Sequence, residues 1–172
     1  MEAVAPPVAV ADLERRLRRL EDEQSIRELI LTYGPAADAG RADHAASLWA
    51  DDGLYDWDAA GEPYAGRDAV EAMLNTDGHR GLIGSGVAHF AGPPLIRLAG
   101  DRATALTYSL IMRRDADGRY YLWRVSAVRW DLARTADGWR VRRRTNRLLD
   151  DTGAGRELFG AALHDMFQED DR

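Results

Sequence analysis

Hydrophobic residues recur at helical spacing through the first part of the chain. They lie mostly three or four residues apart, with arginine and glutamate between them: Leu13, Leu17, Leu20, Ile26, Leu29, Ile30 and Tyr33. This spacing predicts a long amphipathic helix that starts near Ala11. Gly34-Pro35 predicts a kink in that helix, because proline lacks an amide donor and clashes with the preceding turn, and Gly40 predicts its end.

Shorter helices and a first strand follow. The pattern predicts a second helix over about 43–50, with Leu48 and Trp49 as its apolar members, and a third helix over 67–74. The sequence DDG at 51–53 predicts a turn, and LYDW directly after it begins a strand that ends at the loop AAGEPYAG.

The second half of the chain has the pattern of strands. They are predicted over 87–98, 103–113, 120–133 and 139–149, separated by turn sequences, and a last helix is predicted over 154–167. Helices followed by long antiparallel strands indicate an α+β fold: a cone-shaped α+β barrel, with three N-terminal helices packed on a curved, mostly antiparallel sheet, plus a C-terminal helix. We expect a flexible arm over 1–9, the cone domain over 10–150, and the C-terminal helix with an acidic tail over 151–172.

Composition narrows the classes of function. The chain has 172 residues, 45% of them hydrophobic, which suits one globular domain. It has no cysteine, which excludes disulfides, thiolate metal sites and a cysteine nucleophile. A net charge of −6 disfavours binding to nucleic acid or an anionic membrane. The sequence has neither an 18-residue apolar run nor a signal-peptide pattern, so we expect a cytoplasmic protein.

The last predicted strand is unusually rich in arginine, and neither of its faces is cleanly apolar. Strict alternation puts Arg140, Arg142, Arg144, Asn146 and Leu148 on one face, and Trp139, Val141, Arg143, Thr145 and Arg147 on the other. Most of these arginines are expected in solvent. An arginine that faced inward would need an anionic or polar partner.

Three polar residues could form a catalytic group if one cavity collected them. His89 stands between apolar residues on a predicted strand, Asp38 lies at the C-terminal end of the long helix, and Tyr33 lies on the same helix. Each of them also fits a structural role: a satisfied core histidine, a solvated carboxylate and a core aromatic. A carboxylate that holds the imidazole, however, makes histidine a competent general base near neutral pH.

The order of motifs resembles the SnoaL-like branch of the nuclear-transport-factor-2-like superfamily. The resemblance spans roughly 20–149 and rests on Tyr33-x4-Asp38 followed by ASLWADDGLYDW, YAGRDAV, AHF, GDRATALTYSL and ADGWRVRRRTNRLLD. It implies the cone fold. Relatives include scytalone dehydratase, bile-acid 7α-dehydratase, hexachlorocyclohexane dehydrochlorinase, ketosteroid isomerase and polyketide cyclases.

The resemblance also implies site residues. Asp38 and His89 match the catalytic dyad of the dehydratases and the dehydrochlorinase, Tyr33 matches a polar pocket residue, and Tyr55 or Trp57 matches an early aromatic residue of the first strand. Arg144 matches an arginine of the dehydrochlorinase, and Asn146 an asparagine of scytalone dehydratase. The third strand offers Tyr108, Ser109 and Met112 where scytalone dehydratase has its second histidine.

These features predict a cofactor-independent lyase or cyclase of the dehydratase type. Its substrate would be a small, largely apolar oxygenated molecule such as a polyketide, steroid-like or terpenoid intermediate. The expected catalytic residues are Asp38, His89, Tyr33, Arg144 and Tyr55; the expected substrate-binding residues are Trp57, Tyr108, Met112 and Asn146. No metal or other cofactor is implied. The alternatives are a non-catalytic ligand-binding or scaffold protein and, less favoured, nucleic-acid binding through 140–147.

Assembly is the last expectation from sequence. The strand over 120–132 carries apolar residues on both faces, and a single pocket cannot cover both. This predicts a homo-oligomer, and the resemblance favours a trimer over a dimer. The C-terminal helix is expected to pack against its own sheet, a neighbouring subunit or the cavity mouth.

Overall fold

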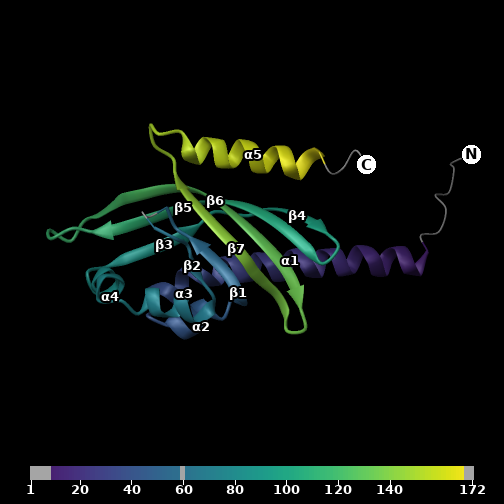
Figure 1. Cartoon of the computed structure of the whole chain (residues 1–172), viewed down its shortest axis with the longest axis horizontal. Helices are drawn as coiled ribbons and strands as arrows, with labels where there is room; N and C mark the ends of the chain where they lie inside the picture. The colour runs from purple at the N-terminus through teal and green to yellow at the C-terminus, as the bar shows by residue number, and fades with distance from the viewer. Residues whose placement is uncertain (1–8, 59–60, 169–172) are drawn as a thin grey trace, which may run out of the picture.

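A curved, unclosed sheet runs through the molecule and carries helices on both faces (Figure 1). The computed structural model describes residues 9–58 and 61–168, so most of the predicted arm and the acidic tail lie outside the described residues. The strand order is β2-β1-β7-β6-β5-β3, with β4 also paired to β5. The strands are β1 Trp49–Asp56, β2 Tyr64–Ala65, β3 Val87–Ala91, β4 Leu95–Ala99, β5 Arg102–Arg114, β6 Tyr120–Thr135 and β7 Gly138–Leu148. All pairs are antiparallel except β1 with β7, which confirms the predicted α+β class and mostly antiparallel sheet.

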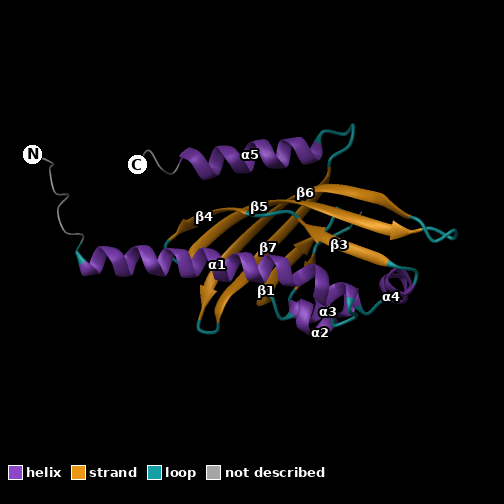
Figure 2. Cartoon of the chain, turned by 180° about the vertical axis from the view of Figure 1, so that it is seen from behind, coloured by secondary structure: helices purple, strands orange, loops and turns teal. Residues whose placement is uncertain are grey.

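The helices divide between the two faces of the sheet (Figures 1 and 2). The helices in the described residues are α1 Val10–Asp38, α2 Ala42–Ala46, α3 Arg67–Leu74, α4 Asp77–Gly84 and α5 Ala154–Gln168. α1 crosses one face, with α2, α3 and α4 gathered near its C-terminal end, and α5 lies on the other face. The main core lies between α1 and the sheet and includes Ile30, Trp49 and Trp130, each at most 1% exposed. None of the helices in the described part of the chain has the length and apolar character needed to cross a membrane.

α1 continues through Gly34-Pro35, where a kink was predicted, and ends where Gly40 predicts. Pro35 lies inside the helix, which runs to Asp38. Gly40 has a φ of +69°, and the amide of Arg41 donates to the carbonyl of Ala36 at 2.9 Å, which closes the helix in a glycine C-cap. Asp38 is therefore the last helical residue, about one and a half turns beyond Tyr33.

α1 also approaches β3 unusually closely. A Cβ atom at Gly34 would lie 2.2 Å from the carbonyl oxygen of His89, so only glycine fits between this helix and this strand. The same contact brings the C-terminal turn of α1 beside His89.

Three predicted elements differ from the structure near β1 and β3. The predicted helix over 43–50 is shorter, because Trp49 and Ala50 already belong to β1. The DDG sequence lies inside β1, where the register with β7 shifts between Trp49 and Leu54, so it is an irregularity within the strand rather than a turn between elements. The predicted strand over 87–98 is two strands, because Gly92-Pro93-Pro94 separates them and proline cannot donate to a ladder. The short strand β2 and the helix α4 were not predicted.

A bulge in β7 changes which arginines face the core. Asp131 pairs with Arg143 and Leu132 pairs with Val141, so Arg142 has no partner residue on β6. The extra residue shifts the alternation, and the buried side chains of β7 are Trp139 and Val141 before the bulge and Arg144, Thr145 and Asn146 after it. The prediction that Arg140, Arg142 and Arg144 share one face is therefore wrong.

α5 packs against its own sheet rather than at the cavity mouth. Ala162 and Met166 are buried on Leu106 of β5, with Phe159 partly buried beside them. Arg129 of β6 and Asp165 of α5 form an ion pair of 2.8 Å. Of the three positions that the sequence left open, the structure thus selects the chain's own sheet.

Candidate functional site

Asp38 and His89 form a hydrogen-bonded pair between α1 and β3. The Asp38 Oδ1 atom lies 2.5 Å from Nδ1 of His89, and Oδ2 accepts a 2.8 Å hydrogen bond from the backbone N–H of the same residue. Two contacts to one residue fix both the position and the rotation of the ring. A carboxylate that accepts at Nδ1 favours the tautomer whose proton sits there, which leaves the lone pair on Nε2.

His89 opens onto a cavity of about 290 Å³ on the concave side of the sheet. The residues that line it come from α1, α3, α4 and six strands, together with residues that adjoin them. They are Tyr33, Tyr55, Trp57, Tyr64, Met73, Thr76, Gly78, His79, Leu82, His89, Ser109, Ile111, Trp123, Arg124, Ser126, Arg144 and Asn146. The structure therefore brings Tyr33, Tyr55, Trp57, Arg144 and Asn146 together around His89, while Asp38 stands behind the histidine ring.

Arg144 is a buried positive charge held by aromatic rings. It is 3% exposed, and its guanidinium carbon lies 4.1 Å from the ring centre of Tyr33, 4.4 Å from Trp130 and 4.8 Å from Tyr55. Among the described residues it has no carboxylate partner, and its Nε and Nη1 atoms have no hydrogen-bond acceptor. Cation–π contacts offset only part of the cost of burying this charge, so the site favours an electron-rich oxygen from a ligand.

The hydroxyl groups of two tyrosines lie next to this charge. The hydroxyl of Tyr33 lies 3.4 Å from that of Tyr55, and both side chains are buried. Burial raises the pKa of the Tyr33 hydroxyl, which stays protonated at physiological pH and can donate a hydrogen bond.

A second histidine, not predicted from the sequence, also lines the cavity. The ring of His79, on α4, stacks on that of His89 with 5.9 Å between centres and 29° between planes. Burial first, and then the nearby His89, lower the pKa of His79, so this ring is neutral at physiological pH. α4 has the glycine-rich sequence DGHRGLIG, which hides its helical period. The one available signal was Thr76, whose hydroxyl caps the helix by accepting from the amide of His79.

Two predicted substrate-binding residues lie away from the cavity. Tyr108 is 57% exposed on the opposite face of β5, where its ring contacts Phe159 of α5 edge-on at 5.1 Å. Met112 is four residues along the same strand and shares that face. The prediction that both form cavity wall is wrong, and their neighbours Ser109 and Ile111 line the cavity instead.

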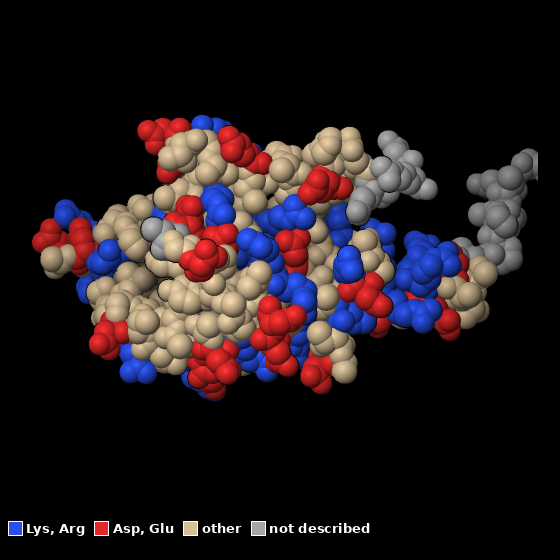
Figure 3. Space-filling view, in the orientation of Figure 1, with Lys and Arg blue, Asp and Glu red and all other residues tan. Residues whose placement is uncertain are grey.

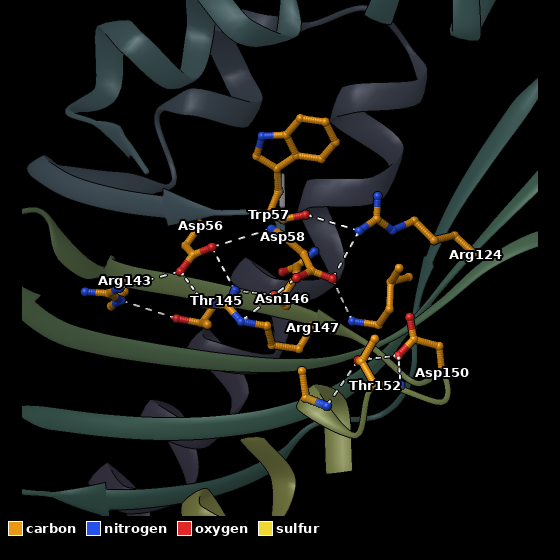
Figure 4. Close-up of polar contacts among 12 residues, drawn as sticks. Asp56, Trp57, Asp58, Arg124, Arg143, Thr145, Asn146, Arg147, Asp150 and Thr152 are labelled. Atoms are coloured by element: carbon orange, nitrogen blue, oxygen red, sulfur yellow. Dashed lines mark hydrogen bonds and ion pairs between the residues drawn. The ribbon is translucent and has the colours of Figure 1, made fainter. Parts of the chain in front are cut away.

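An ion-pair network fixes the end of β1 against β7 (Figure 4). Asp56 accepts two hydrogen bonds of 2.8 Å from Arg147, and Arg143 lies 3.6 Å from the same carboxylate. The hydrogen bond from Arg147 lowers the pKa of Asp56. Asp58 accepts a hydrogen bond of 2.8 Å from the backbone of β7. The chain between these two aspartates is thereby held so that Trp57 reaches the cavity wall.

Carboxylates pair with most of the arginines of the basic strand. Arg142 donates to the exposed Asp52 at 2.7 Å, and Arg143 and Arg147 both pair with Asp56. Figure 3 shows acidic and basic residues intermixed on the face in view rather than separated into patches. This arrangement gives little support to nucleic-acid binding through 140–147. Within the described residues, no group of three or more histidine, aspartate or glutamate side chains is placed to hold a metal ion.

The fold of this chain is similar to those of several solved structures. An NTF2-like protein with a cystatin-like fold from Novosphingobium aromaticivorans is 43% identical, with a TM-score of 0.84 over 87% of this chain and 96% of that one. A protein from the same organism, provisionally named a scytalone dehydratase, is 19% identical, with a TM-score of 0.63 over 77% of this chain and 87% of that one. A protein from Catenulispora acidiphila, solved in complex with S-DNPA, is 22% identical, with a TM-score of 0.65 over 75% of this chain and 94% of that one.

No curated protein matches the sequence. The family model of the SnoaL-like domain matches residues 18–145, a segment that includes Tyr33, Asp38, His89 and Arg144. This segment is most of the chain, and the alignment with the 43% identical NTF2-like structure also covers most of both chains. The chain therefore belongs to the SnoaL-like domain family.

Proposed function

We propose that this protein is a cofactor-independent lyase or cyclase of the dehydratase type. Its substrate would be a small, largely apolar oxygenated molecule, such as a polyketide, steroid-like or terpenoid intermediate. The observation that carries the proposal is a histidine that Asp38 holds at Nδ1 and that faces a cavity also containing a buried arginine with no carboxylate partner among the described residues. A base and a cation that face one small space suit the removal of a proton next to a carbonyl group.

The chemistry follows from the positions of these groups. Nε2 of His89 takes a proton from the carbon next to the substrate carbonyl, and Asp38 stabilises the imidazolium that forms. The negative charge moves to the carbonyl oxygen, where Arg144 and the hydroxyls of Tyr33 and Tyr55 stabilise it. In a dehydration the enolate expels a hydroxyl group from the neighbouring carbon. That hydroxyl leaves as water after it receives the proton from His89, so the enzyme returns to its starting state.

The remaining cavity residues bind and orient the substrate. Trp57 and Ile111 offer apolar surface, and Asn146, Ser109 and Ser126 offer hydrogen-bonding groups on the sheet. The Catenulispora acidiphila relative in complex with S-DNPA, and the relative provisionally named a scytalone dehydratase, are consistent with ligand binding or catalysis in this fold.

Deuterium exchange separates catalysis from binding alone. Small cyclic ketones and β-hydroxy ketones that raise the melting temperature of the protein are incubated with it in D2O, and mass spectrometry follows deuterium uptake into the ketone. We expect uptake, or loss of water, well above the rate without protein. A ketone that binds and raises the melting temperature, but whose exchange stays at the uncatalysed rate across the panel, would instead support the non-catalytic binding protein.

A further inference from the structure

α1 carries two apolar faces, and the described part of the chain packs against only one of them. Its C-terminal half buries residues such as Ile26, Ile30 and Tyr33 against the sheet. A second stripe, Val10, Leu13, Leu17 and Leu20, is 71%, 51%, 55% and 63% exposed. At about 100° per residue, this stripe points away from the sheet, on the opposite side of the helix from the buried set.

The N-terminal half of α1 extends beyond the sheet edge, past β4, in both views (Figures 1 and 2). Over 9–21 every residue is exposed except Asp12, which is half-buried. The first side chain along α1 that bonds to the sheet is Asp22, which accepts from Arg134 at 2.6 Å and from Trp139 at 3.1 Å. A helix segment of about three turns is marginal in water without packing, so this one needs a partner.

The stripe has the spacing of a coiled-coil seam. Val10 and Leu17 are seven residues apart, as are Leu13 and Leu20, and the two pairs interleave with a 3-4-3 spacing, as the a and d positions of two heptads do. The next seam positions are Gln24 and Arg27, which end the apolar run. A β-branched residue at the first a position and leucine at both d positions favour a parallel coiled coil of two helices.

Charges beside the seam select the partner and its direction. In a parallel pair, Arg16 at position g faces Glu21 at position e of the other helix, and symmetry repeats the contact. An antiparallel pair that sets Val10 against Leu20 brings Arg16 near its own copy and Glu14 near its own copy, which is repulsive. We propose that the N-terminal half of α1 pairs in parallel with the same segment of a second copy of this chain.

The geometry and charge of the helix agree with this partner rather than with a lipid surface. Because the stripe points away from the sheet, the two domains lie on the outside of the pair and do not overlap. Residues 10–23 contain four arginines and five acidic residues, a net charge of −1, so an anionic membrane gains no electrostatic attraction.

The test is the mass of the full-length protein by light scattering over a range of concentrations. The wild-type protein is expected to have at least twice the mass of one chain, which is 19.1 kDa. Leu17→Glu removes two seam leucines per pair and should weaken the association by roughly 100-fold or more. The matched control is Leu163→Glu, at an exposed leucine on α5 (39%), and it should keep the wild-type mass. Circular dichroism checks that both variants stay folded.

Charge exchange tests the parallel direction. Arg16→Glu and Glu21→Arg should each weaken association, and the double variant should restore it, because the two charges still face each other across the pair. An unchanged mass for Leu17→Glu would overturn the proposal, as would a double variant that does not recover. A monomeric wild type that binds vesicles of anionic lipid through Leu17 would overturn it in favour of a membrane. None of these outcomes depends on the proposed lyase activity.

Discussion

Replacing His89 with glutamine is expected to reduce the single-turnover rate by about 10²–10⁴-fold, while the fold and ligand binding persist. Glutamine can reach a similar hydrogen-bonding position, but it cannot accept a proton near neutral pH. The measurement is turnover, or deuterium exchange of a bound ketone, alongside thermal unfolding of the same samples. His44→Gln makes the same change at an exposed histidine on α2 and should leave the rate unchanged.

Asp38→Asn should lose a comparable amount, since it removes the charge that stabilises the imidazolium and admits the wrong tautomer. The two losses should not add, so the double variant should be little slower than His89→Gln alone. A structural histidine would give another result: a lower melting temperature, with full activity per folded molecule. Full activity in a folded His89→Gln variant would end the proposed mechanism.

Arg144→Met should be the second most damaging change in the cavity, with a loss of about 10²–10³-fold in turnover. Methionine keeps much of the contact with Tyr33 and Trp130 but removes the charge that would meet the oxyanion. Because that charge is buried and no carboxylate in the described part of the chain pairs with it, its removal should not lower the melting temperature and can raise it. A structural arginine would instead lose stability when replaced, so lost activity with undiminished stability distinguishes a binding arginine from a structural one.

Arg143→Met is the matched control. It makes the same substitution on the same strand, one residue earlier, where the side chain is 45% exposed and lies 3.6 Å from Asp56. Asp56 keeps its two hydrogen bonds from Arg147, so activity and stability should both stay close to wild type. If Arg143→Met and Arg144→Met lose activity equally, the buried Arg144 has no special role in catalysis.

The parts of the fold that follow from local periodicity were predictable from sequence. The long helix, its end at Gly40 and the last three long strands carry their apolar pattern in consecutive residues, and the structure confirms them apart from small shifts at their ends. The predicted helix over 67–74 matches α3. Tyr33 and Asp38 could be placed together because one helix carries both of them.

Features that depend on partner strands were not predictable. The bulge at Arg142 exists because β7 and β6 are out of step by one residue, which no local pattern of β7 reveals, and it decides that Arg144 faces the core. Alternation alone likewise could not tell which face of β5 is concave, so Tyr108 and Met112 were assigned to the cavity in place of Ser109 and Ile111. His79 was missed because three glycines dilute the apolar pattern of α4.

The protonation of the His89 ring tests the central claim most directly, and it needs no substrate. The claim is that Asp38 holds a proton on Nδ1 and leaves Nε2 free to act as a base toward the cavity. ¹⁵N NMR of protein labelled at histidine, assigned with the His89→Gln variant, distinguishes a protonated from an unprotonated ring nitrogen. In the neutral ring we predict a protonated Nδ1 and an unprotonated Nε2, with that state lost or mixed in Asp38→Asn. A neutral wild-type ring whose proton sits on Nε2 would contradict the account.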